Sequence, residues 1–139
     1  MSATLSLKVE TSHDELDRIT AAVEDFGEQE SWSPALIFRV NLVLEELGLN
    51  VMDYGYDDGL HEFEIVLTSN PDALTIEIID DGRPFDPLSD TPPPVLEGSI
   101  EERPVGGLGV HLVRELMDEL HYRREQGRNH LTLVTRKME

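Results

Sequence analysis

Residues 61–80, HEFEIVLTSNPDALTIEIID, constrain the fold more than any other segment, because apolar and polar side chains alternate in two consecutive runs. A period of two places every second side chain on one face, which is typical of a β-strand with one buried side. Asn70, Pro71 and Asp72 separate the runs, and residues of these types are common in turns. The segment therefore predicts a β-hairpin.

Helical periodicity dominates three other segments, residues 12–30, 33–55 and 107–120. In the first, Ser12 and Glu15 have the spacing of a capping box. In the second, Ser33 can cap the helix, Pro34 suits its first turn, and Gly55 can end it. Further strands are predicted over residues 4–10, 121–126 and 129–137.

The order of these elements, β-α-α-β-β-loop-α-β-β, predicts an α+β fold with helices on one face of a mixed sheet. At 139 residues, we expect one domain spanning 1–139. Residues 86–105 hold five of the eight prolines and have no clear period, which indicates a functional or disordered loop.

Composition excludes several classes of function. The net charge of −18 is far too acidic for a protein that grips nucleic-acid backbones. Eight of the eleven basic residues lie from Arg83 onward, so an anion site is expected in the second half of the chain. The sequence has no cysteine, and no segment that predicts a signal peptide or a membrane span. We therefore expect a cytoplasmic protein that does not bind membranes.

Glu46 and Asn50 lie four residues apart in the second predicted helix and so share one face. A carboxylate beside an amide oxygen offers a base and a metal ligand. The alternative is an ordinary solvated helix surface, and the pattern E-x-x-x-N is weak evidence alone.

Two further motifs indicate a ligand site. In the sequence IIDDGRPFDP, residues 78–87, Asp80 stands at the end of a predicted strand. Either a surface loop or a small-molecule site would explain an aspartate at this position. The sequence GGLG, residues 106–109, opens a helix with glycines, whose free N–H groups suit phosphate. A flexible hinge is the alternative there. Neither a P-loop nor a Rossmann fingerprint is present.

Taken in order, these motifs resemble the GHKL ATPase superfamily. The phrases EELGLNVMDYGY, DDGRPFDP and GGLGVHLVRELMDELHYRREQGRNHLTLVTRK are similar to the anti-sigma-factor serine kinases of bacterial partner switching. The resemblance covers essentially the whole chain. It implies a two-layer α/β sandwich of the Bergerat type, with a mixed, mostly antiparallel sheet.

The resemblance also implies roles for individual residues. Asp80 would accept a hydrogen bond from the adenine amino group, and Gly82 would let the base approach the backbone. Glu46 would orient or deprotonate the attacking group. Asn50 would hold Mg²⁺ between the phosphates of ATP.

Phosphate binding would fall to the segment that precedes and opens the third helix. Gly107, Leu108 and Gly109 would form the turn around the β- and γ-phosphates. Residues 86–105 would be the ATP lid, and Arg103 would act on the γ-phosphate as a second catalytic residue beside the helical glutamate.

Two functions follow as hypotheses. The first is an ATP-dependent serine/threonine kinase that phosphorylates an anti-sigma antagonist of the STAS-like type. The second is a nucleotide-regulated binding module that sequesters a sigma factor or another regulator with little or no turnover. A homodimer is a further option. The chain departs from the family at Val51 and Tyr54, where Ala and His are common.

Overall fold

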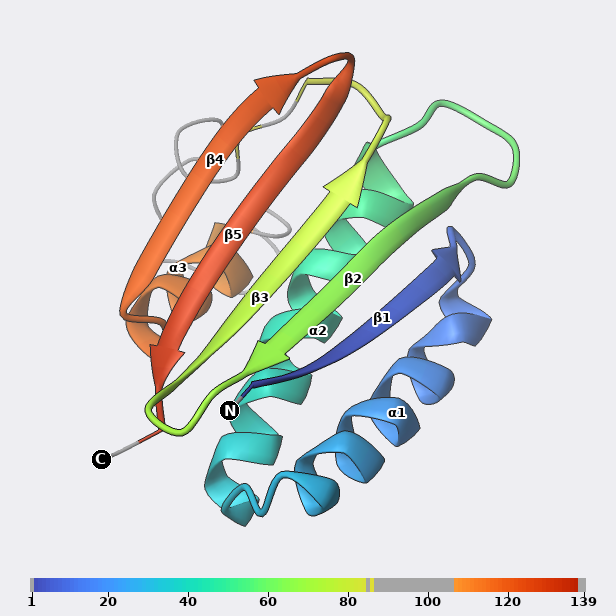
Figure 1. Ribbon diagram of the computed structural model, residues 1–139. Helices are drawn as coiled ribbons and strands as arrows, with labels where there is room; N and C mark the ends of the chain where they lie inside the picture. The colour runs from blue at the N-terminus through green and yellow to red at the C-terminus, as the bar shows by residue number, and fades with distance from the viewer. Residues whose placement is uncertain (1, 85, 87–106, 138–139) are drawn as a thin grey trace, which may run out of the picture.

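The computed structural model describes residues 2–84, 86 and 107–137. Its elements in chain order are β1 (Ala3–Glu10), the 3-10 turn η1 (His13–Glu15), α1 (Leu16–Gln29), α2 (Pro34–Tyr54), β2 (Glu62–Ser69), β3 (Ala73–Asp80), α3 (Gly107–Leu116), β4 (Glu119–Glu125) and β5 (Arg128–Arg136). The three helices cover one face of the sheet (Figure 1). The predicted two-layer α+β fold is therefore confirmed.

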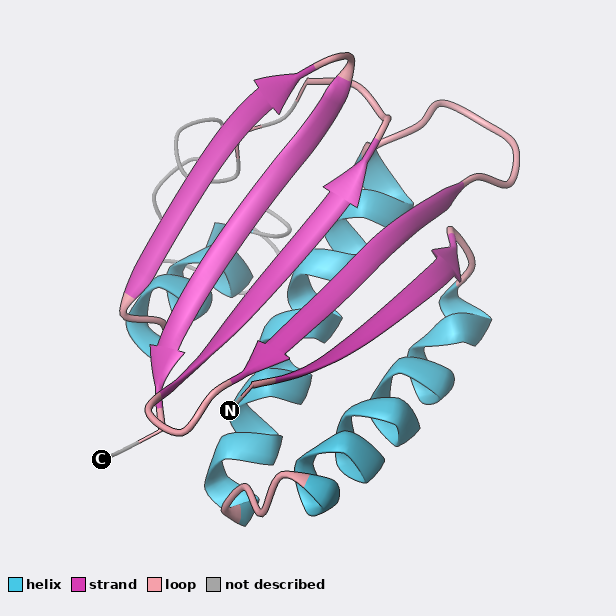
Figure 2. Ribbon diagram, in the orientation of Figure 1, coloured by secondary structure: helices cyan, strands magenta, loops and turns pink. Residues whose placement is uncertain are grey.

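The sheet has five strands in the order β1-β2-β3-β5-β4, and all four pairings are antiparallel (Figure 2). The predicted hairpin forms between β2 and β3, and the Asn70 side chain accepts hydrogen bonds from the N–H groups of Asp72 and Ala73. The pairing of β3 with β5 sets Asp80 directly opposite Asn129. Two polar residues 49 positions apart thus become neighbours at one end of the sheet.

Alternation along the strands produces the core. On β3, Leu74, Ile76 and Ile78 face the helices and are buried. From the other layer, α2 buries a stripe that includes Val40 and Leu44, as its helical period predicts. Full burial of one such side chain contributes about 1.5–3 kcal/mol, so the two layers hold each other in place.

The first turn of α2 forms as the sequence predicts, whereas the capping box does not. Ser12 does accept a backbone hydrogen bond, but it caps η1, not α1. Glu15 accepts from the backbone N–H of Glu10 at 2.9 Å and from Arg18, which in turn donates to the carbonyl of Lys8 at 3.0 Å. The free edge of β1 takes these side chains because its outward backbone groups lack a neighbouring strand.

The third helix is shorter than predicted, because it ends at Leu116 and β4 begins at Glu119. The N–H of Asp118 donates to the carbonyl of Val134 on β5 at 2.9 Å. Pairing with β5 therefore replaces the last helical turn. Among the described residues, no helix is both long and apolar enough to cross a membrane.

Two buried helical glycines give a prediction on stability. A Cβ on Gly27 would lie 2.7 Å from Cγ1 of Ile37 and 2.9 Å from Cε3 of Trp32, whereas a Cβ on Gly48 would meet Phe63 at 3.9 Å. Gly27→Ala should lower the free energy of unfolding by roughly 1–3 kcal/mol through overpacking. Gly48→Ala should raise it by up to about 1 kcal/mol, because alanine favours the helix. Urea denaturation of both variants is the measurement, and equal effects would contradict the packing.

Candidate functional site

A cavity lies at the end of β3 that carries Asp80, between α2 and the strands β3, β4 and β5. Its lining residues are Leu47, Asn50, Val51, Gly55, Ile78, Asp80, Arg83, Tyr122, Asn129 and Leu131. Most of the surface of this lining is apolar, and polar side chains such as Asn50 and Asp80 interrupt it, which is the composition of small-molecule sites in general. The structure thus brings the predicted residues Asn50 and Asp80 into one cavity.

The Asp80 carboxylate is held firmly by the protein. It is 8% exposed, and its Oδ1 accepts from the N–H of Gly82 at 2.9 Å and from Nδ2 of Asn129 at 2.9 Å. Within the described part of the chain, both of these bonds end on the same oxygen, so Oδ2 is left for a ligand. Of the two readings of this aspartate, the structure favours the small-molecule site.

Gly82 is required by the protein's own packing. A Cβ at this position would lie 2.5 Å from the carbonyl oxygen of Gly55, which also accepts from the N–H of Arg83 at 2.9 Å. The loop after α2 and the turn of residues 80–83 (the Asp80 turn) therefore touch backbone to backbone. The sequence motif D-x-G gives no sign of this reason for the glycine.

Side chains of β4 and β5 that were not predicted from the sequence hold the Asp80 turn. Asn129, 5% exposed, donates to Asp80 and also to the carbonyl of Arg83 at 2.8 Å. Tyr122 donates through its hydroxyl to Oδ1 of Asn129, and Arg124 donates to the carbonyl of Gly82 at 2.8 Å. The sequence does contain a signal for Asn129, because the alternation along its strand places this polar residue on the inward face, together with buried leucines.

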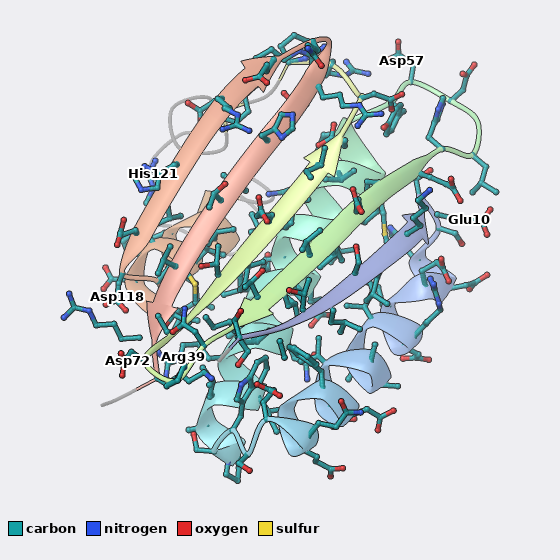
Figure 3. All side chains as sticks on the ribbon, viewed as in Figure 1. Glu10, Arg39, Asp57, Asp72, Asp118 and His121 are labelled. Atoms are coloured by element: carbon teal, nitrogen blue, oxygen red, sulfur yellow. The ribbon has the colours of Figure 1, made fainter. Side chains whose placement is uncertain are left out.

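A second set of contacts fastens the rim of the cavity. Asp81 is exposed, yet it accepts from the hydroxyl of Tyr56 at 2.6 Å. Burial, together with the hydrogen bond to the Asp81 side chain, raises the pKa of Tyr56, so this hydroxyl keeps its proton. Asp57, at the upper end of the molecule in Figure 3, forms an ion pair with Arg83. The loop after α2 is thereby joined to the Asp80 turn at three points.

Glu46 lies one helical turn before Asn50 on α2 and is half-buried, outside the set of residues that line the cavity. Burial, and secondarily the charge of Glu45, raise the pKa of the Glu46 carboxyl above its usual value. A carboxylate with a raised pKa is a stronger base. Its place on the helix and its protonation equilibrium both suit proton transfer beside the cavity.

The predicted phosphate turn is described in part. Gly107, Leu108 and Gly109 form the first turn of α3, where backbone N–H groups lack helical partners and the helix dipole is positive. The predicted lid lies outside the described residues except for Asp86, and Arg103 lies outside them too. The described residues contain no cluster of three acidic or histidine side chains that could hold a metal ion.

The raised pKa of Glu46 predicts how stability depends on pH. Since the folded state favours the protonated carboxyl, the ionised form costs stability, and this cost grows as the pH rises from the usual pKa of 4.5 to the raised pKa of the folded state. Glu46→Gln should therefore be more stable than the parent at about pH 7. The difference should shrink at a pH below 4.5. Urea denaturation across this range is the measurement, and a destabilised Glu46→Gln at neutral pH would contradict it. The exposed Glu24 on α1 provides the control, Glu24→Gln, for which we expect little change.

Known proteins similar to this chain identify its family. A family model described as a histidine kinase-like ATPase domain matches residues 9–135. The serine/threonine-protein kinase BtrW of Bordetella bronchiseptica is 32% identical over 115 residues, which cover 81% of this chain and 80% of BtrW. The serine-protein kinase RsbW of Bacillus cereus is 28% identical over 91 residues, which cover 63% of this chain and 57% of RsbW.

A solved structure shares the fold. The crystal structure of the RsbU and RsbW domains of a Mycobacterium tuberculosis protein superposes with a TM-score of 0.63 at 14% identity, covering 96% of this chain and 32% of the other. The matched range of the family model, 9–135, contains every residue of the cavity. The chain therefore belongs to the family of histidine kinase-like ATPase domains.

Proposed function

We propose that this chain is an ATP-dependent serine/threonine protein kinase that acts as an anti-sigma regulatory factor. The observation that carries the proposal is the Asp80 carboxylate, buried and fixed through Oδ1, with Oδ2 left at an apolar cavity. The names of its relatives BtrW and RsbW, both protein kinases, support the same activity.

The cavity suits an adenine ring. Oδ2 of Asp80 can accept a hydrogen bond from an exocyclic amino group, and Ile78 and Leu131 supply apolar surface for the faces of the ring. A fixed acceptor within an apolar slot provides both orientation and affinity for a planar base. Gly82, in the Asp80 turn, keeps the backbone there free of a side chain.

The phosphates would extend toward α3. ATP with Mg²⁺ supplies the γ-phosphoryl group in a form whose charge is partly neutralised. Asn50 lines the cavity, and its amide oxygen would be a protein ligand of the magnesium ion. Phosphates and water would supply most of the other ligands, as is usual for Mg²⁺. The N–H groups of Gly107, Leu108 and Gly109 would bind the phosphates, and Arg103 with the lid at 86–105 would complete the site.

Glu46 would act on the acceptor. Its carboxylate accepts the proton of a serine or threonine hydroxyl as the oxygen attacks the γ-phosphorus, while the bond from that phosphorus to the bridging oxygen breaks and ADP leaves. The phosphoryl acceptor is an anti-sigma antagonist of the STAS-like type, which the kinase meets in the cytoplasm. A sigma factor is the alternating partner, and the kinase assembles as a homodimer. The domain comprises residues 1–139.

Asp80→Asn should weaken ATP binding by at least about tenfold, because an amide cannot replace the charged acceptor and presents an N–H donor in one of its orientations. Isothermal titration calorimetry with ATP and Mg²⁺ is the measurement. Asp81→Asn is the matched control, because the neighbouring carboxylate is exposed and outside the cavity, and it should keep its affinity. Unchanged affinity of Asp80→Asn would refute the adenine site.

Glu46→Gln should retain ATP binding and lose phosphoryl transfer by roughly 10²–10⁴ in rate, the usual contribution of a general base. The assay incubates the chain with labelled ATP and a STAS-like antagonist from the same genome, and follows label on the antagonist. Transfer at the parental rate would remove the base role from Glu46. A parent protein that binds ATP but transfers no label would instead support the binding module.

A further inference from the structure

Tyr122 lies on β4, the edge strand, with its side chain half-buried against the cavity. Its hydroxyl donates to Oδ1 of Asn129 at 2.5 Å. Neither the motifs of the chain nor the proposed chemistry gives this tyrosine a role. The side chain is, however, one hydrogen bond away from the residue that holds Asp80.

The amide of Asn129 has a defined orientation. An asparagine side chain carries two N–H donors on one end and an acceptor on the other. Here Nδ2 donates to Oδ1 of Asp80 at 2.9 Å and to the carbonyl of Arg83 at 2.8 Å. If the amide were reversed, its oxygen would face two other acceptors, Oδ1 of Asp80 and the carbonyl of Arg83. In the observed orientation, the amide oxygen instead accepts a hydrogen bond from the Tyr122 hydroxyl.

We propose that Tyr122 is a positioning residue that, through Asn129, fixes the Asp80 carboxylate and so determines that the site prefers adenine to guanine. The proposal rests on the function above, since it requires a base at Asp80. The order of action is from the Tyr122 hydroxyl to the Asn129 amide, and from that amide to Oδ1 of Asp80.

Selectivity follows from the direction of the bonds. With Oδ1 held by Asn129 and Gly82, Oδ2 presents an acceptor to the cavity. Adenine carries an amino donor at C6, whereas guanine carries a carbonyl oxygen at that position, which a carboxylate repels. A buried polar group that cannot pair rejects the wrong ligand strongly, provided that it cannot rotate away. Loss of the Tyr122 hydroxyl would loosen the amide and allow that rotation.

Tyr122→Phe tests the proposal, with ATP and GTP as probes in calorimetric titrations of the full chain. We expect the affinity for ATP to fall and that for GTP to rise, because Oδ2 can then turn away from the guanine carbonyl, so the ratio of the two falls about tenfold. Tyr56→Phe is the matched control, because it removes a hydroxyl that donates to a carboxylate outside the cavity. Its ratio should equal that of the parent, whereas a purely structural effect of Tyr122 would weaken both nucleotides alike.

A double-mutant cycle tests whether Tyr122 acts through Asn129. If it does, adding Tyr122→Phe to Asn129→Ala should cause no further loss of ATP affinity. Additive losses, or an unchanged ATP-to-GTP ratio in Tyr122→Phe, would overturn the inference while the ATP site stands. A parent protein that binds no ATP would overturn the proposed function and this inference together. Should Tyr122→Phe fail to fold by circular dichroism, Tyr122→Leu, which also lacks a donor, carries the same expectations.

Discussion

The hydrogen bond between the Asn129 amide and the Asp80 carboxylate joins the ends of β3 and β5, and the geometry of the cavity depends on it. The bond exists because antiparallel register sets these residues opposite each other, on the face that the helices cover. A buried carboxylate requires such donors, since an unpaired charge would be too costly there. The same strand pairing that builds the core thus also fixes the carboxylate of the site.

Electrostatics places a second demand on the molecule. With a net charge of −18, the chain as a whole repels a polyphosphate at long range. Binding must therefore come from local groups at short range, where screening by salt leaves them effective. At the described end of the sheet, Arg83 and Arg124 serve the protein itself, because one pairs with Asp57 and the other donates to the Asp80 turn. The first turn of α3 adds backbone N–H groups that have no partner within the helix.

Local pattern predicted much of the fold. The period of two in residues 61–80 indicated a hairpin that forms, and Ser33 with Pro34 marked the start of α2 to the residue. The end of α3 and the partner of Glu15 were wrong, because both depend on strands distant in sequence. Pairing of β3 with β5 cannot be read from periodicity.

The same limit applies to the site. Asn50 and Asp80 were predicted from motifs, and the cavity contains both. The contributions of Tyr122 and Arg124 could not be predicted, because their hydrogen bonds to Asn129 and to the carbonyl of Gly82 follow from the strand register. Asn129 was indicated only by its place on the inward face of β5, and its partner Asp80 again follows from the register. Gly82 was predicted for a ligand, whereas its contact with Gly55 is a matter of folding.

The side chains along the free edge of β1 affect the tendency of the protein to aggregate. An open strand edge is a template on which another chain can add its own strand, the first step of fibrous aggregation. Glu15 occupies the N–H of Glu10, and Arg18 occupies the carbonyl of Lys8. One N–H and one carbonyl near the end of this edge are thus occupied by a paired acid and base. Both side chains come from η1 and α1, the elements that follow β1 directly in the chain, so this protection is encoded next to the strand that it covers.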